Sequence, residues 1–88
     1  ALDLAIAVAV ASSFREQDVD GHTVVMGEIG LNGEVRAVTN IERRLKEAQK
    51  MGFKTAVIPM GNRLSNSFGL TLLPVSSVTE TLNVVIGR

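Results

Sequence analysis

The chain has 88 residues, of which 45% are hydrophobic and 20% are charged, a composition typical of one small globular domain. Nine basic residues balance nine acidic ones, which argues against a nucleic-acid binder that is basic overall and leaves open a local basic patch. Cysteine is absent and there is one histidine, so we expect no disulfide, no thiolate metal site and no zinc site built from histidines.

Residues 2–13, LDLAIAVAVASS, form the first predicted element. Large and small residues alternate there, but both sets are apolar, so the alternation does not define a strand face. Five alanines in the first eleven residues favour a buried helix. The run is shorter than the roughly 20 apolar residues of a membrane span, and Asp3 stands where a signal peptide carries positive charge. Because the chain starts inside this run without Met, we interpret it as a fragment of a longer polypeptide.

A hairpin is predicted next. The polar connection REQDVDGH contains the turn signal Asp20-Gly21, and TVVMGEIGL at 23–31 then reads as a strand. Asn32-Gly33 predicts a two-residue type I′ turn, in which both central residues have positive φ. The sequence EVRAV at 34–38 is expected to return as the partner strand.

The second predicted helix has the clearest boundaries. Thr39 and Glu42 have the spacing of a capping box, in which each side chain bonds a main-chain amide at the helix start. A single apolar stripe follows, and Gly52 stands where a left-handed residue ends a helix. The residues of this predicted stripe are Ile41, Leu45, Ala48 and Met51.

The remainder predicts two strands, a loop and a short helix. FKTAVIP at 53–59 is a buried strand closed by Pro59, 60–69 is a loop, and LTLLPV at 70–75 is an edge strand or one that ends at Pro74. Ser77 and Glu80 repeat the capping-box spacing before a helix that reaches Val85. Together these elements predict an α+β fold with α/β layers.

Catalytic side chains are not apparent. A Ser–Lys dyad needs a lysine that burial keeps neutral, whereas Lys46 and Lys50 fall opposite the apolar stripe and the side of the strand that Lys54 occupies is not predicted. The serines lie in loops, at helix ends or at predicted caps. We interpret His22 as a solvated polar residue, and Glu28 as facing solvent or pairing with Arg36. The glycines of GEIGLNG match no phosphate-binding spacing and are assigned to the hairpin.

A row of cations on the second helix is the candidate binding site. Arg43, Lys46 and Lys50 share a sector of about 60° on a helical wheel, and Arg44 flanks it. Such a row could contact phosphates, or it could be an ordinary solvated face with ion pairs from Glu42 to Lys46 and from Arg43 to Glu47. With three Phe and no Trp or Tyr, base stacking is not expected to contribute.

The stretches DLAIAVAVASS, GEIGLNGEVRAVTNIERRLKEAQKMGF and AVIP together resemble the C-terminal Lon-protease-like domain of the RadA (Sms) family, bacterial DNA repair and recombination ATPases. The resemblance covers most of the 88 residues. Lon proteases are also similar, with a Gly-Glu-Ile hairpin, a helix and a Val-Ile-Pro strand. The Lon-like domain of magnesium-chelatase-type ATPases is a related alternative that fits DLAIAVAVASS and NIERRLKEA less well.

This resemblance implies a fold like that of ribosomal protein S5 domain 2, with residues 1–88 as one Lon-protease-like domain whose first strands precede Ala1. The positions of the catalytic Ser and Lys of Lon proteases correspond to Ala1, approximately, and to Glu42. Both groups are therefore missing, and Glu42 is expected to close the capping box instead. The domain itself is accordingly expected to be non-enzymatic and to bind no cofactor.

The resemblance also implies properties of a whole protein. A zinc finger and a RecA-like ATPase core would precede this domain, with ATP, Mg and Zn as cofactors, in a cytoplasmic DNA-dependent ATPase or helicase. Hexameric rings would act on single-stranded or branched DNA, and this domain would serve as ring scaffold and auxiliary DNA surface through Arg43, Lys46, Lys50 and Arg44. No membrane partner is implied.

Two other functions remain open from the residues. The first is a proteolytic domain of a Lon-type Ser–Lys peptidase, with a displaced dyad or a serine upstream of Ala1. The second is an oligomerising module, in which apolar strand residues form subunit contacts. The residues assigned to those contacts are Val24, Met26, Leu70 and Leu72.

Overall fold

The computed structural model describes residues 2–15 and 21–85. The chain has a mixed α and β architecture of three helices and six short strands in its described part, which agrees with the α and β composition predicted from the sequence. The predicted Asp20-Gly21 turn lies partly outside the described residues, which resume at Gly21. The elements in chain order are β1 (Leu2–Asp3), α1 (Leu4–Arg15), β2 (Thr23–Val25), β3 (Glu28–Ile29), β4 (Val35–Arg36), α2 (Ile41–Lys50), β5 (Thr55–Pro59), β6 (Thr71–Val75) and α3 (Val78–Val85).

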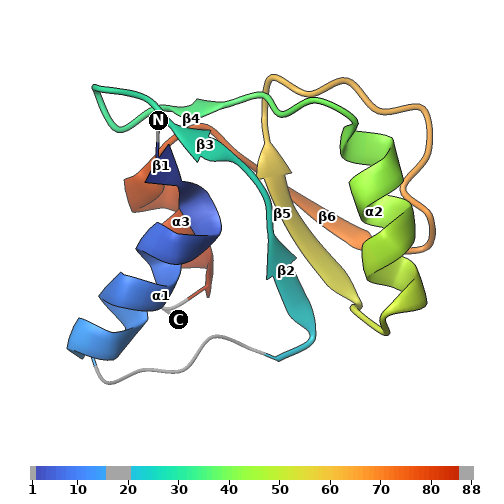
Figure 1. Cartoon of the computed structure of the whole chain (residues 1–88), viewed down its shortest axis with the longest axis horizontal. Helices are drawn as coiled ribbons and strands as arrows, with labels where there is room; N and C mark the ends of the chain where they lie inside the picture. The colour runs from blue at the N-terminus through green and yellow to red at the C-terminus, as the bar shows by residue number, and fades with distance from the viewer. Residues whose placement is uncertain (1, 16–20, 86–88) are drawn as a thin grey trace.

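The strands form two small sheets. β2, β5 and β6 are parallel and lie in the order β2-β5-β6, so β6 is an edge strand as predicted. β1, β3 and β4 are antiparallel and lie in the order β1-β3-β4. Figure 1 shows α1 and α3 on one side of the parallel sheet and α2 on the other, which makes three layers.

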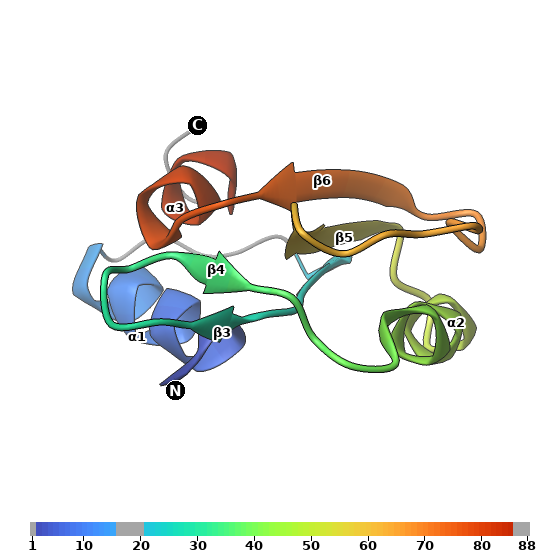
Figure 2. The ribbon, with the colours of Figure 1, turned by 90° about the horizontal axis from the view of Figure 1, so that it is seen from above.

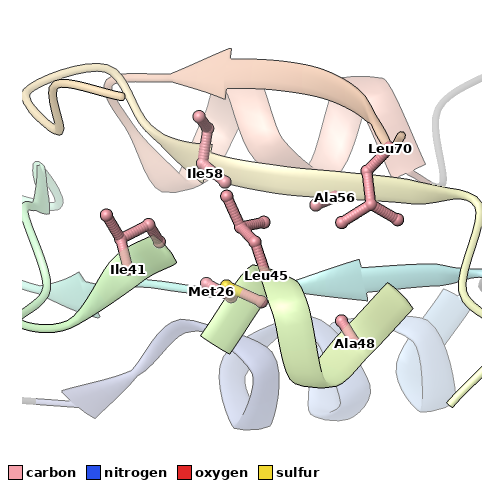
Figure 3. Close-up of a cluster of buried hydrophobic side chains, with 7 residues drawn as sticks. All are labelled: Met26, Ile41, Leu45, Ala48, Ala56, Ile58 and Leu70. Atoms are coloured by element: carbon pink, nitrogen blue, oxygen red, sulfur yellow. The ribbon is translucent and has the colours of Figure 1, made fainter. Parts of the chain in front are cut away.

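The central strand β5 divides the core into two clusters. Its side chains alternate between the two faces, so Ala56 and Ile58 pack toward α2 whereas Val57 packs toward α1 and α3. The first cluster, drawn in Figure 3, consists of Met26, Ile41, Leu45, Ala48, Ala56, Ile58 and Leu70. The second consists of Leu4, Val8, Val35, Val57 and Val75. Figure 2 shows the same separation of α2 from α1 and α3.

Helix α1 confirms the helical interpretation of the first apolar run, but it begins two residues later than predicted. Leu2 and Asp3 pair with Ile29 and Glu28 as strand β1. The carboxylate of Asp3 then accepts hydrogen bonds from the amides of Ala5, at 2.8 Å, and Ile6, at 3.3 Å. An aspartate that satisfies first-turn amides is a strong N-terminal helix signal, and it sets the boundary here.

The strand predicted at 23–31 is two strands that belong to different sheets. β2 runs parallel to β5, and the chain then turns at Met26–Gly27 so that β3 joins the antiparallel sheet. Gly27 has φ 151°, and a Cβ there would lie 2.9 Å from Cγ1 of Val35. Glycine is required at this junction because both the backbone angle and the close packing exclude a side chain.

The hairpin between β3 and β4 is confirmed, but its predicted turn type is wrong. Gly33 has φ 78°, whereas Asn32 is absent from the residues with positive φ in the described chain. The amide of Gly33 bonds the carbonyl of Gly30 at 3.1 Å, which fits a type I turn followed by one left-handed glycine. The carboxylate of Glu34 accepts from the Asn32 amide at 3.0 Å and pairs with Arg36 at 3.4 Å.

The pKa of Glu34 is lowered by this turn. The main-chain amides of Glu34 and Asn32 are the main causes, and the Arg36 guanidinium adds to them.

Helix α2 ends as predicted, but its buried apolar stripe is one residue shorter than the predicted one. Gly52 has φ 96°, and the amides of Gly52 and Phe53 bond the carbonyls of Gln49 and Ala48, both at 3.1 Å. These two bonds define a Schellman motif. Met51, the last residue of the predicted stripe, is 76% exposed, because the helix ends at Lys50 and the chain has already begun to turn away.

The start of α3 confirms most of the second predicted capping box. The hydroxyl of Ser77 accepts from the amide of Glu80 at 3.1 Å. The carboxylate of Glu80 bonds the amide and hydroxyl of Ser76, one residue before the position that the motif predicts. Among the residues that the structure describes, no helix is long and apolar enough to cross a membrane.

Candidate nucleic-acid interface

Helix α2 presents the predicted cations to solvent. Its buried side is formed by Ile41, Leu45 and Ala48, which pack on the parallel sheet (Figure 3). All four candidate residues are exposed, as the helical wheel predicted: Arg43, Arg44, Lys46 and Lys50. The arrangement follows from the 3.6-residue period, which places three of these cations opposite the apolar stripe and Arg44 on its flank.

One of the two predicted ion pairs is formed. Arg43 lies 3.5 Å from Glu47, and their side chains are 80% and 63% exposed, so the pair is open to solvent and contributes little to stability. The pair predicted between Glu42 and Lys46 is not formed, because the Glu42 carboxylate bonds Ser65 instead. Within residues 2–15 and 21–85, no ion pair involves Lys46 or Lys50, so both ammonium groups are available to a polyanion.

The predicted capping box at the start of α2 is wrong. Asn40 occupies the N-cap position in the left-handed region, with φ 55°, and makes no side-chain cap hydrogen bond. Helix α2 therefore starts one residue later than the box requires, and Glu42 is the second residue of the helix rather than the third. From there its carboxylate cannot complete the reciprocal bond to Thr39.

Glu42 holds the loop between β5 and β6. Its Oε2 accepts from the amide of Ser65 at 2.8 Å and from the Ser65 hydroxyl at 2.7 Å. The amide bond is the larger cause and the hydroxyl bond the second cause of the lowered pKa of Glu42. A carboxylate that receives two hydrogen bonds is stabilised in its charged form. Glu42 is therefore an anion with a structural partner.

A second contact fixes the same loop. The side-chain amide of Asn62 accepts from the amide of Val38 at 3.0 Å and donates to the Val38 carbonyl at 2.9 Å. Leu64 and Phe68 also pack against the core cluster under α2. Arg63 lies between these anchors and is exposed. Arg63 was not predictable as a neighbour of α2, because a loop has no periodicity that relates it to the face of a distant helix.

One of the two positions that match the Lon catalytic pair, Glu42, lies within the described residues. Ala1 lies outside the described residues. The carboxylate of Glu42 accepts two hydrogen bonds from Ser65. The chain's three lysines, Lys46, Lys50 and Lys54, are all exposed, so none is in the sheltered environment that a neutral lysine base requires.

The strand residues assigned to subunit contacts belong to the protein core. Met26 and Leu70 are buried, at 7% and 6% exposure, and Val24 and Leu72 pack against the same cluster. That prediction is wrong for Met26 and Leu70, which are buried under α2, whereas Val24 and Leu72 are partly exposed. The side chains of Met26 and Leu70 are consequently unavailable for an interface.

The other polar candidates lie at the surface. His22 is exposed, and its carbonyl accepts from the amides of Lys54 and Thr55 where β5 begins. Glu28 is exposed and stands opposite Arg36 in the strand register, while the ion pair of Arg36 is with Glu34. In the described part of the chain, no group of three or more His, Cys, Asp or Glu residues is placed to hold a metal ion.

Comparison with known proteins relates the chain to one family model and to several individual proteins. Residues 1–62 match the family model described as subunit ChlI of Mg-chelatase. Among curated proteins, the DNA repair protein RadA of Halalkalibacterium halodurans is 49% identical over 90 residues, which cover 100% of this chain and 20% of that protein. The RadA proteins of Synechocystis and Bacillus subtilis are 45% and 43% identical, over 98% and 99% of the chain and 17% and 19% of their own lengths.

The two results agree, because the matches to RadA extend over nearly the whole chain, including the part that matches the ChlI model. The chain spans about a fifth of the length of these relatives. The resemblance to RadA proteins noted in the sequence is thereby confirmed, and the match to the ChlI model is consistent with it. The chain belongs to the family that the ChlI model describes, and over nearly its whole length it is similar to proteins named DNA repair protein RadA.

Proposed function

We propose that residues 1–88 are a non-catalytic Lon-protease-like domain of a DNA repair ATPase, which supports ring assembly and contributes an auxiliary DNA-binding surface. The observation that carries the DNA part is the exposed cation row of α2, in which Lys46 and Lys50 form no ion pair within the described residues. The relatives named DNA repair protein RadA support the setting.

The absence of catalysis is proposed from Glu42 and the lysines. In the resemblance to Lon proteases, Glu42 stands where the catalytic lysine would lie, and Ala1 approximately where the serine would lie. An acid that is held by Ser65 cannot act as the neutral amine that a Ser–Lys dyad needs. The exposure of Lys46, Lys50 and Lys54 supports the same conclusion.

An S5 domain 2-like fold that is incomplete at its N-terminus is supported by an uncovered face. Helix α1 is apolar on most sides, yet Ile6 and Val10 are 59% and 51% exposed. A groove of about 250 Å³ lies beside it, next to the edge strand β2. Its lining residues are Ala5, Val8, Ala9, Thr23, Val24, Val25 and Phe53. Helices that are apolar all round are normally buried, so further strands of the domain would fit here.

The whole protein is proposed to follow the RadA pattern. It would be a cytoplasmic ATPase with a zinc finger and a nucleotide-binding core, and ATP, Mg and Zn would bind there rather than in these 88 residues. Hexameric rings would engage single-stranded or branched DNA. Size-exclusion chromatography with light scattering, on a full-length RadA protein with and without residues 1–88, tests the scaffold role. If the protein without this domain forms rings with the same number of subunits, the scaffold role is contradicted.

The DNA surface is tested by charge reversal in a full-length RadA protein that contains this sequence. Arg43, Lys46 and Lys50 are changed together to Glu, and binding to a labelled single strand is measured from 50 to 300 mM salt. Each lost phosphate contact flattens the logarithmic salt dependence by about 0.7, so the triple variant is expected to flatten it by about two. The matched comparison is between two double variants, Lys46 and Lys50 reversed together against Arg36 and Lys54 reversed together, because the second pair lies outside α2. If the triple variant keeps both the affinity and the salt dependence of the wild type, α2 is not a DNA-binding surface.

The proteolytic alternative has a separate test. When the full-length protein is treated with a serine-reactive probe, we expect no serine to be labelled stoichiometrically. Stoichiometric labelling that a single Ser substitution abolishes would show a working nucleophile and would overturn the non-catalytic assignment.

A further inference from the structure

The loop at 60–69 is attached to the start of α2 at two points. Asn62 exchanges two hydrogen bonds with the main chain of Val38, and Ser65 donates two to Glu42. Figure 1 shows this loop leaving the end of β5 and running past α2 before it enters β6. Because Asn62 and Ser65 are only three residues apart, the backbone between them has little freedom to move away from α2.

Arg63 lies within this restrained segment and faces solvent. Its neighbour Leu64 packs against the core cluster, so successive side chains of the loop point into and away from the domain. No ion pair of Arg63 exists within the described residues, which leaves its guanidinium available to an external anion. A guanidinium forms bidentate hydrogen bonds with phosphate, and a restrained loop loses less conformational entropy when it binds.

The position of Glu42 indicates which side of α2 the loop flanks. Glu42 bonds the loop, and Lys46 lies four residues further along, on the same flank of the helix. Lys46 is the member of the cation row closest to that flank, and Lys50 follows it by another turn. The loop is therefore attached on the flank of α2 that carries Lys46, whereas Arg44 is on the opposite flank.

We propose that Arg63 extends the DNA-binding row of α2, and that the Glu42–Ser65 and Asn62–Val38 contacts position it there to bind the sugar–phosphate backbone. This inference rests on the proposed DNA surface and adds a residue from a second element to it. In this arrangement Glu42 does not contact DNA and affects DNA binding only by holding the loop that carries Arg63. The contact surface is then formed by Arg43, Lys46, Lys50 and Arg63.

The experiment uses a full-length RadA protein that contains this sequence, with a labelled single strand at 50–300 mM salt. Arg63→Ala is expected to weaken binding about three- to five-fold near 150 mM and to flatten the salt slope by about 0.7. Arg63→Lys should keep the slope, since the charge remains. Arg36→Gln serves as the matched control, because it removes one exposed arginine from β4. The melting temperature of each variant is measured to confirm folding.

The positioning role has its own readout. Ser65→Ala should weaken binding in the wild-type background and have no further effect when Arg63 is already Ala. Equal effects of Ser65→Ala in both backgrounds would overturn the positioning role. If charge reversal on α2 flattens the slope and Arg63→Ala does not, the Arg63 assignment is wrong while the α2 surface stands. If neither changes binding, the proposed DNA surface itself is wrong.

Discussion

The carboxylate of Glu42 accepts two hydrogen bonds from Ser65, at 2.8 Å from the amide and 2.7 Å from the hydroxyl. The two residues are 23 positions apart, so this contact joins the first turn of α2 to the loop that leads into β6. It also accounts for the absence of the predicted ion pair between Glu42 and Lys46. This carboxylate thus links helix α2 to the loop beside the candidate interface.

The first prediction concerns the energetic coupling of this pair. Ser65→Ala and Glu42→Gln should each lower the melting temperature by about 2–5 °C, because each removes part of a charge-assisted hydrogen-bond pair. The double variant should lose less than the sum of the two single losses. Thermal unfolding followed by circular dichroism provides the measurement. Additive losses would mean that the two side chains do not interact in solution.

The second prediction concerns pH. The Ser65 bonds lower the pKa of Glu42 below its ordinary value of 4.5, so as pH falls the unfolded state takes up a proton on Glu42 before the folded state does. The stabilisation by Glu42 should therefore be complete above about pH 5 and be lost as pH falls through the lowered pKa. The difference in unfolding free energy between wild type and Glu42→Gln, measured in urea from pH 7 to pH 3, should shrink below pH 4.5. A difference that stays constant across this range would contradict the assigned role of Ser65.

The third prediction concerns the junction between the two sheets. Gly27→Ala should destabilise the protein by about 2–4 kcal/mol, since it combines an unfavourable backbone angle with overpacking against Val35 and Leu4. Gly21→Ala is the control, because a Cβ there meets no atom within 4 Å. Urea unfolding of both variants gives the comparison. Equal stabilities of the two variants would show that the chain does not turn at Gly27 as described.

The fourth prediction separates the real apolar stripe of α2 from the one predicted by periodicity. Leu45 has no exposed surface, so Leu45→Ala should cost about 3–5 kcal/mol. Met51 is 76% exposed, so Met51→Ala should change stability by less than about 0.5 kcal/mol. The two free energies of unfolding are compared under the same conditions. A large cost for Met51→Ala would place its side chain in the core.

The sequence alone determined the features that depend on nearby residues. Helix α2 with its buried Ile41, Leu45 and Ala48, its glycine end at Gly52, the β3–β4 hairpin and the Ser77 cap were all predictable, because each rests on side chains within one or two helical turns or a single tight turn. The exposure of Lys46 and Lys50 followed from the same periodicity. Similarity to the RadA family was also visible in the order of these short stretches.

Only the tertiary structure decided the features that join distant segments. The division of 23–31 into β2 and β3 depends on close packing of Gly27 against Val35 and Leu4. The partner of Glu42 depends on where the loop between β5 and β6 passes the start of α2, whereas local spacing favoured Thr39. The attachment of the Arg63 loop to the start of α2 likewise depends on contacts between segments far apart in sequence. Hydrogen-bond partners and close contacts between segments far apart in sequence are set by the packing of the whole fold, which the pattern of neighbouring residues does not encode.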